Sequence, residues 1–291
     1  MKPAPFKYHA PRSTDDVLQL LASTDSPCLL AGGQSLMPML NFRLLAPGHV
    51  IDLNRVSALT GIEVTDGVLR IGAMTRQCDL ETAAAVRDNV PLLQAALAHV
   101  GHRQTRNRGT LGGSLCHLDP AAELVTAAMA LDAALITQSS SNSRCVPMAS
   151  WITGYLTNAL QPDELLTAVE FPLWSRSHGH GFVEYARRKG DFAIVGVAAL
   201  LDFDAAGVIT RAAVAIGGCA AAPQRPAPVE QALIGNLPTP AIFKAAARLA
   251  ADIEAHSDAH VKADYRQHLA RVLTERALIE AARHGRQGFQ A

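Results

Sequence analysis

The 291-residue sequence has no CxxC pair, and its five cysteines stand far apart. Iron–sulfur clusters and structural zinc sites are usually held by closely spaced cysteines, so we expect neither within this chain. Isolated cysteines in odd number also favour reduced thiols over a disulfide framework. Cys28 and Cys219 lie in apolar stretches, and we expect both to be small core residues.

Net charge and long apolar runs are missing too. The 26 basic and 26 acidic residues balance, which argues against broad electrostatic binding to nucleic acid or to an anionic membrane. The longest apolar runs, such as residues 194–201, fall well short of the roughly 20 residues of a membrane-spanning helix. Residues 1–13 lack the apolar core of a secretory signal. We therefore expect a cytoplasmic protein with no membrane span and no nucleic-acid partner.

Familiar catalytic motifs are absent as well. The sequence has no GxSxG, no HExxH and no serine–lysine pattern, so no catalytic residue is predicted. His99, His102 and His117 match no zinc spacing, and structural or solvent-facing roles are favoured for them. No metal ligand is predicted in the chain.

With 49% hydrophobic and 18% charged residues, the composition is typical of a globular protein of two or three domains. The opening reads as a β-α-β unit, with helices over 15–23 and 36–45 and strands at 28–31 and 49–53. A hairpin follows, because Asp66-Gly67 separates two alternating stretches. Helices and strands then continue to Pro172.

The last third of the chain has a different character. Residues 181–190, 192–204 and 208–218 read as three strands, and helices are expected at about 229–235, 240–252 and 259–284. Three antiparallel strands followed by helices indicate a separate α+β domain. We predict one domain over residues 1–175, with subdomains of about 1–57 and 58–175, and a second domain over 176–291.

Two glycine pairs stand out, and the first lies in "AGGQSL", residues 31–36. This segment follows a strand and precedes a helix, so its backbone N–H groups would be free to meet an anion, which glycine allows to approach closely. There is no lysine and no GK[ST] or GxGxxG pattern, which argues against a nucleoside triphosphate and against a Rossmann site. A phosphate or diphosphate held by backbone donors remains, with a plain turn as the alternative.

The second pair lies in "TLGGSL", residues 110–115, and has similar chemistry. We expect a loop with small hydroxyls and unobstructed N–H groups, offered by Thr110, Gly112, Gly113 and Ser114. Two such segments in different subdomains would clamp a dinucleotide from both sides. Asp119 and Glu123 follow, and their carboxylates would accept hydrogen bonds from ribose or ribityl hydroxyls. The alternative for Asp119 is a helix cap before Pro120.

Three stretches carry a resemblance to a known family: residues 31–53, 101–133 and "RRKGDFAIV" at 187–195. They resemble the FAD-binding subunit of the molybdenum hydroxylases, which include carbon monoxide dehydrogenase and xanthine dehydrogenase. The resemblance covers the whole chain and is nearest to the carbon monoxide dehydrogenase medium subunit. It implies an α+β fold, with a two-subdomain FAD domain of the vanillyl-alcohol oxidase and MurB (PCMH) type and a C-terminal flavoprotein domain.

The resemblance also implies a function. The chain would be the electron-transfer subunit of a heterotrimer in which a large subunit holds the molybdenum cofactor and a small subunit holds two [2Fe–2S] clusters. Electrons would reach FAD in this chain and leave to an external acceptor. The organic substrate would bind elsewhere.

The resemblance assigns site residues by position. FAD would be bound by Ala31, Gly32, Gly33, Gln34, Ser35, Leu36, Thr110, Gly112, Gly113, Ser114 and Glu123, with Leu166 or Leu165 against the flavin ring. Lys189 would approach the electron-rich edge of the flavin. Because Gln34 stands where many relatives have histidine, we expect the FAD to be non-covalent.

Other interpretations stay open. A self-contained FAD oxidoreductase with its own substrate would need a base or proton donor beside the flavin, and a non-flavin phosphate-binding module would not explain the C-terminal domain. Arg103, Arg106 and Arg108 would either neutralise a diphosphate, meet a partner subunit or lie in solvent. Asp191 would pair with Arg187 or Arg188 at a strand end.

Overall fold

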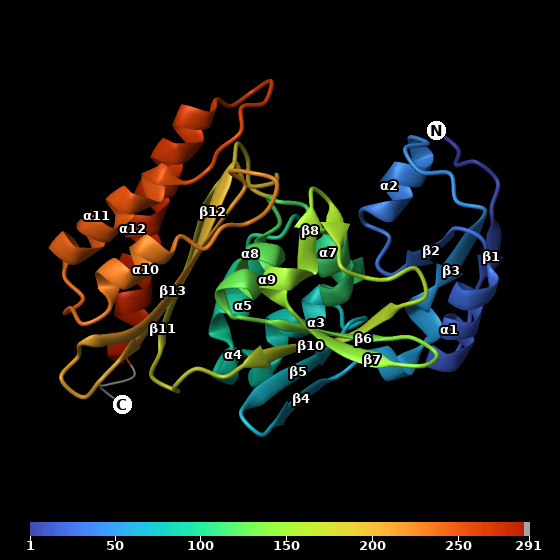
Figure 1. The fold of residues 1–291 in the computed structure, drawn as a ribbon, viewed down its shortest axis with the longest axis horizontal. Helices are drawn as coiled ribbons and strands as arrows, with labels where there is room; N and C mark the ends of the chain where they lie inside the picture. The colour runs from blue at the N-terminus through green and yellow to red at the C-terminus, as the bar shows by residue number, and fades with distance from the viewer. Residues whose placement is uncertain (288–291) are drawn as a thin grey trace.

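The computed structural model describes residues 1–287, in which three main sheets lie side by side and carry helices on their faces (Figure 1). The N-terminal unit is a parallel sheet of order β1-β3-β2. Its elements are β1 (Lys7–His9), α1 (Thr14–Ser23), β2 (Pro27–Leu30), α2 (Leu36–Asn41) and β3 (His49–Asp52), followed by the short helices η1 (Leu53–Arg55) and η2 (Ser57–Leu59).

Helix α2 is shorter than the sequence pattern predicted. It ends at Asn41 rather than Leu45, because Arg43 takes a left-handed conformation with φ 56°. The N–H groups of Arg43 and Leu44 bond back to the carbonyls of Leu40 and Met39, at 3.0 and 2.9 Å. This pattern of bonds closes a helix end, and glycine usually occupies the left-handed position.

The central unit is an antiparallel sheet of order β4-β5-β10-β6-β7. Asp66 and Gly67 both have positive φ, which confirms the predicted hairpin between the first two strands. The strands are β4 (Ile62–Thr65), β5 (Val68–Gly72), β6 (Ala134–Gln138), β7 (Ser143–Pro147) and β10 (Leu165–Pro172), with a small hairpin of β8 (Ile152–Gly154) and β9 (Thr157–Asn158). The helices are α3 (Gln77–Thr82), α4 (Ala84–Asn89), α5 (Pro91–Leu97), α6 (Arg103–Arg108), α7 (Leu111–His117), α8 (Glu123–Ala130) and α9 (Met148–Trp151).

The C-terminal unit is an antiparallel sheet of order β11-β12-β13. Its elements are β11 (Gly179–Tyr185), β12 (Val195–Phe203), β13 (Ile209–Gly217), α10 (Ala227–Leu233), α11 (Pro240–Leu249), η3 (Ala250–Asp252) and α12 (Ala263–Gln287). The predicted α+β fold class, with three antiparallel strands and helices at the C-terminal end, is confirmed. One detail is wrong: residues 186–191 form a turn between β11 and β12, whereas a strand through residue 190 was expected.

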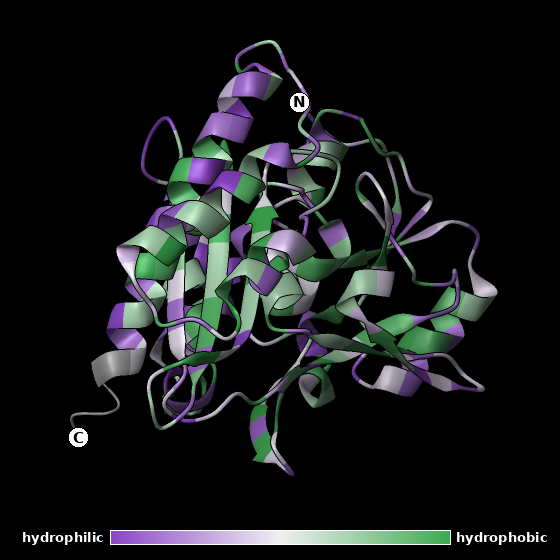
Figure 2. Cartoon of the chain, turned by 60° about the vertical axis from the view of Figure 1, so that its left-hand side comes forward, coloured by the Kyte–Doolittle hydropathy of each residue, from purple (hydrophilic) through white to green (hydrophobic). Residues whose placement is uncertain are grey.

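Strand β12 explains the apolar run at residues 194–201. Val197 and Ala199 pack in the core beneath α12, whereas Ala198 and Leu200 pack in the core shared with α5 and α8. Because successive side chains of a strand point to opposite faces, both faces must be apolar when both are covered. Figure 2 shows hydrophobic residues along these strands and hydrophilic residues on the outer helices.

A separate apolar core joins the N-terminal unit to the central one. Val17 and Leu18 of α1 pack with Met74 and Leu165 from the central unit, and all four are buried. The two units are therefore held together by burial of apolar surface. Within residues 1–287, none of the helices is both long and apolar enough to cross a bilayer.

Candidate functional site

A cavity of about 610 Å³ lies between the N-terminal unit and the central unit. Its size is within the roughly 300–1,000 Å³ that small-molecule and cofactor sites occupy. Thirteen of the fourteen predicted site residues line it: Ala31, Gly32, Gly33, Gln34, Ser35, Leu36, Thr110, Gly112, Gly113, Ser114, Asp119, Glu123 and Leu166. The fourteenth, Lys189, does not.

The first glycine segment is a loop with free donors. None of the backbone N–H groups of residues 32–35 donates a hydrogen bond to an acceptor among the described residues, and all four residues line the cavity. Gly33 has φ 74°, a left-handed conformation that glycine adopts without strain. Consecutive free N–H groups in such a loop make a concave site for an anion.

The first segment also touches the backbone just before the second. A Cβ atom at Gly32 would lie 2.3 Å from the carbonyl oxygen of Arg108 and 2.8 Å from Cα of Gly109. No side chain fits in that space. Glycine at position 32 therefore allows the backbone of the first segment to pack directly against the backbone of residues 108–109.

The second glycine segment is not the loop that the sequence pattern predicted. Thr110 caps helix α7, and Gly112, Gly113 and Ser114 form its first turns. The first N–H groups of the helix are already used: Leu111 donates to Thr75 O, Gly112 to Ala73 O, Gly113 to Thr110 Oγ1 and Ser114 to Thr110 O, at 2.8–3.2 Å. The unobstructed backbone donors expected at residues 111–114 are therefore not found, whereas the Ser114 hydroxyl has no hydrogen-bond partner among residues 1–287.

The glycines of α7 are required by packing. A Cβ atom at Gly112 would lie 2.7 Å from Ala73 at the end of β5, and one at Gly113 would lie 2.7 Å from Thr110 Oγ1. The helix therefore lies directly against the central sheet, and its cap is compatible only with glycine at position 113.

The two carboxylates after α7 differ in their surroundings. Asp119 Oδ1 accepts a hydrogen bond from the Ala121 N–H at 2.9 Å, and α8 begins later with Ala122 as its cap, so Asp119 closes a turn rather than capping that helix. Glu123 is only 5% exposed, and its carboxyl receives no hydrogen bond from any other described residue. Burial raises the pKa of Glu123 to about 7, and the charges of Glu184 and Asp119 add to this effect.

The segment at residues 187–195 reaches the cavity through an aromatic ring. Phe192 lines the cavity and is 62% exposed, whereas Lys189 is exposed in the turn before it. Gly190 has φ 88° and packs against the ring of His102. Asp191 forms no ion pair with Arg187 or Arg188 among the described residues; its N–H donates to Arg188 O at 3.1 Å.

The remaining lining is mostly apolar and uncharged. Leu165 and Leu166 of β10, the two alternatives for a ring contact, both line the cavity and are buried. In the part of the chain that the structure describes, no lysine or arginine lines it. Arg106 instead pairs with Glu81 at 2.9 Å, away from the cavity.

Several lining residues were not predicted. Gln77, in the first turn of α3, is buried, and its Oε1 atom has no hydrogen-bond partner among the described residues. The Asn158 side chain of β9 donates from Nδ2 to Cys116 O and accepts the Leu160 N–H at Oδ1. No local motif marks either residue, because tertiary packing brings them to the cavity. Cys28, expected in the core, is half-buried and lines the cavity, whereas Cys219 is buried as expected.

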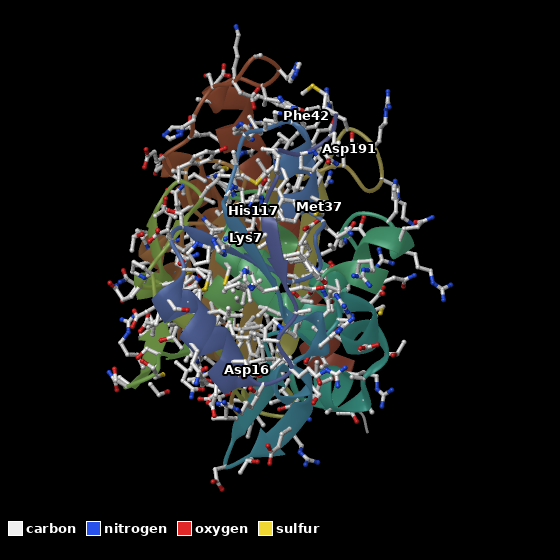
Figure 3. All side chains as sticks on the ribbon, turned by 90° about the vertical axis from the view of Figure 1, so that its right-hand side faces the viewer. Lys7, Asp16, Met37, Phe42, His117 and Asp191 are labelled. Atoms are coloured by element: carbon white, nitrogen blue, oxygen red, sulfur yellow. The ribbon has the colours of Figure 1, made fainter. Side chains whose placement is uncertain are left out.

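The predicted histidines do not come together. His117 of α7 lines the cavity, His102 meets the turn at residue 190, and His99 pairs with Glu184 at 3.3 Å. Figure 3, drawn from the side of the N-terminal unit, shows His117 in the same region as Met37 of α2, while Asp16 of α1 lies at the other end of that unit. No group of three or more metal-ligating side chains gathers within residues 1–287.

Comparisons with known proteins cover the whole chain. The family model described as "FAD binding domain in molybdopterin dehydrogenase" matches residues 4–174, and "CO dehydrogenase flavoprotein C-terminal domain" matches residues 180–281. The 6-hydroxypseudooxynicotine dehydrogenase complex subunit alpha of Paenarthrobacter nicotinovorans is 37% identical over 98% of this chain and 97% of its own length.

Solved structures agree in fold over nearly the full length. A chain of carbon monoxide dehydrogenase from Hydrogenophaga pseudoflava matches with a TM-score of 0.94 and 32% identity, over 98% of this chain and 99% of that one. A chain of quinoline 2-oxidoreductase from Pseudomonas putida 86 matches with a TM-score of 0.93 and 38% identity, over 97% and 99%. The predicted fold type, an FAD domain followed by a flavoprotein C-terminal domain, is confirmed.

Proposed function

The chain belongs to the family of FAD-binding subunits of molybdenum-containing dehydrogenases, and from that premise we propose that it is the electron-transfer subunit of a heterotrimeric molybdenum hydroxylase. Its partners would be a small subunit with [2Fe–2S] clusters and a large subunit with the molybdenum cofactor. The complex would work in the cytoplasm. Residues 1–175 would form the FAD domain, and 176–291 the C-terminal domain.

The observation that carries this proposal is the cavity with donors on one wall and acceptors on the other. The free N–H groups of residues 32–35 suit the diphosphate of FAD, which needs donors because no cationic side chain among the described residues lines the cavity. Glu123 suits the ribityl or ribose hydroxyls, since a buried carboxyl without donors gains most from them. The unpartnered Gln77 Oε1 is a further acceptor for such a group.

The apolar side of the cavity suits the flavin ring. Leu165 and Leu166 would pack against it and exclude water from one face, and Phe192 would cover it from the turn that follows β11. When bound, FAD supplies the chemistry of accepting and releasing electrons singly or in pairs. The chain itself would bind, orient and shield the cofactor. Lys189 lies outside the cavity lining, so any action on the flavin would be through its charge.

The full chain, expressed alone and incubated with FAD, tests the cofactor assignment. We expect a two-banded flavin spectrum, FAD released by acid at one equivalent per chain, and no iron or molybdenum. Affinity purification of the tagged chain from its native cells should then bring down a complex with iron and molybdenum in addition to FAD. A native complex with FAD but neither metal would contradict the proposal and favour a self-contained oxidoreductase.

A further inference from the structure

Arg76 lies between β5 and α3, outside the cavity lining, and bonds to groups from both sides of the cavity. Its Nη1 donates to the backbone carbonyl of Arg108, just before the second glycine segment. Its Nη2 donates to Oδ1 of Asn54, which belongs to the N-terminal unit. One guanidinium therefore joins the two units beside the proposed FAD site.

Asn54 continues the connection to the first glycine segment. Its Nδ2 donates to the carbonyl of Ala31 at 3.0 Å, at the start of the loop with free N–H groups. Its own backbone N–H donates to Asp52 Oδ1 at 2.9 Å, and Tyr8 donates its hydroxyl to Asp52 Oδ2 at 2.5 Å. The Asn54 side chain is thus fixed at a defined position and bonded on both ends.

The Arg108 carbonyl oxygen is the atom nearest to where a Cβ atom at Gly32 would lie. Gly32 leaves no room for a Cβ atom there, because that atom would lie 2.3 Å from Arg108 O. The bond from Arg76 therefore holds in place the backbone group against which residues 31–33 pack. A shift of this carbonyl would move both walls of the cavity at once.

We propose that Arg76 and Asn54 form a latch that sets the spacing between residues 31–35 and 108–114 and so positions the two walls for FAD, an inference that rests on the proposed function. The latch is a positioning device and not the main hold between the units. That hold is the apolar core in which Met74 and Leu165 pack against α1. Loss of the latch should therefore change the geometry of the cavity more than the stability of the fold.

Substitution by lysine distinguishes a latch from a role in which Arg76 only supplies positive charge. Arginine offers a planar fork that bonds two acceptors at once, whereas lysine offers a single ammonium on a flexible stem. If Arg76 served only to place a positive charge near the diphosphate, R76K would retain most of its effect. As a latch, Arg76 cannot be replaced by lysine, and loss of Asn54 should have the same consequence as loss of Arg76.

The test compares R76M, R76K, N54A and the double variant N54A/R76M in the full chain. FAD release is followed by the recovery of flavin fluorescence on dilution, and melting of the FAD-free protein is recorded in parallel. We expect each single variant to release FAD about tenfold faster, the double variant to be no worse than the worse single one, and melting temperatures to stay within about 3 °C of the wild type. Hydrogen exchange of the FAD-free protein should rise in residues 108–114, where most N–H groups are hydrogen-bonded, and stay unchanged in α12.

Different results would overturn the latch and the proposed function. Release at the wild-type rate in R76K supports a charge effect and overturns the latch. An additive double variant, or unchanged exchange in residues 108–114, would overturn it as well. If R76M does not fold, N54A decides the matter by the same measurements. A wild-type chain that takes up no FAD refutes the proposed function, and hydrogen exchange then still decides whether the latch exists.

Discussion

Residues 31–36 and 110–114 border the same cavity, and each has a glycine pair followed within two residues by a serine, yet glycine serves a different purpose in each. In the first segment it permits a left-handed turn and backbone contact, and the N–H groups of residues 32–35 stay free. In the second it permits a helix to pack against β5, and the N–H groups are used inside the fold. Two similar sequences thus form different structures. Residues 31–35 form a loop with free N–H donors, whereas residues 110–114 form the capped first turn of helix α7.

The difference assigns separate tasks to the two walls. The first wall offers backbone donors for an anion, and the second offers the Ser114 hydroxyl together with the Glu123 carboxyl that follows. A dinucleotide has both an anionic diphosphate and neutral hydroxyls, so the two walls are complementary to different parts of one ligand. Substitutions in each wall should therefore fail in different ways.

Gly32→Ala should have the largest effect, because its Cβ atom would lie 2.3 Å from a backbone oxygen that cannot rotate away. We expect loss of detectable FAD and a fall of about 3 kcal/mol in the free energy of unfolding, measured by urea denaturation. Gly48→Ala is the matched control, since a Cβ atom there meets nothing within 4 Å. A Gly32→Ala variant with wild-type FAD content would show that the two walls do not meet as described.

Glu123→Gln should change the pH dependence of stability. The pKa of about 7 in the folded state lies above the ordinary glutamate value of 4.5, so the folded state keeps this proton to a higher pH than the unfolded state does. The neutral Glu123 carboxyl makes its full contribution to the free energy of unfolding below pH 4.5. This contribution is lost as the pH rises from 4.5 through 7. At pH 8 the FAD-free variant should be more stable than the wild type by about 3 kcal/mol, with little difference at pH 4.5.

Thermal melting of the FAD-free wild type and Glu123→Gln across this pH range checks the expectation. If their melting temperatures run parallel, Glu123 ionises normally and the assigned burial is wrong. FAD should reverse the ranking, because ligand hydroxyls donate better to a carboxylate than to an amide oxygen.

Thr110→Ala and Ser35→Ala compare the two segments at the residue that directly precedes a helix, α7 in one case and α2 in the other. Thr110 accepts the Gly113 N–H at 3.0 Å and caps α7, whereas Ser35 makes no capping bond to α2. We expect Thr110→Ala to lower the free energy of unfolding by about 1 kcal/mol and Ser35→Ala to change it by less than about 0.5 kcal/mol. Equal losses in urea denaturation would remove the structural distinction between the segments.

Lys189→Ala should have the smallest effect on FAD content. The side chain is exposed in the turn before Phe192 and does not line the cavity. FAD affinity should change by less than about twofold, as for a surface charge, with any effect confined to the flavin reduction potential. Lys244→Ala on α11 is the control. A large loss of FAD in Lys189→Ala alone would mean that the Lys189 side chain itself contacts the cofactor.

Sequence patterns predicted the elements whose cause is local. The turn at Asp66-Gly67 follows from residues that tolerate positive φ, and the C-terminal sheet follows from long apolar strands. The end of α2 was missed because Arg43 takes the left-handed conformation that closes this helix. Glycine usually occupies that position, so the sequence gives no sign of the helix end. Helix α7 was missed because a glycine pair is typical of a loop, whereas the Thr110 cap and the burial of Leu111 and Leu115 favour a helix here.

The candidate site was predictable where it is continuous in sequence. Residues 31–36 and 110–114 each contribute as a block, so a motif marks them together. Gln77, Asn158 and the latch residue Arg76 stand alone in the sequence, and only the packing of distant elements brings them to the cavity. Which wall supplies the donors also depends on hydrogen bonds to Ala73 and Thr75, which no pattern in residues 110–114 reveals.

The most direct test of the donor loop is an amide nitrogen–proton NMR spectrum of the full chain, recorded without ligand and with FAD, and with riboflavin as a control that lacks phosphate. We expect FAD to shift the amide signals of residues 32–35 strongly and those of residues 111–114 weakly, and riboflavin to leave the signals of residues 32–35 unchanged. Strong FAD shifts at residues 111–114, with none at 32–35, would contradict the assignment of the diphosphate to the first glycine segment.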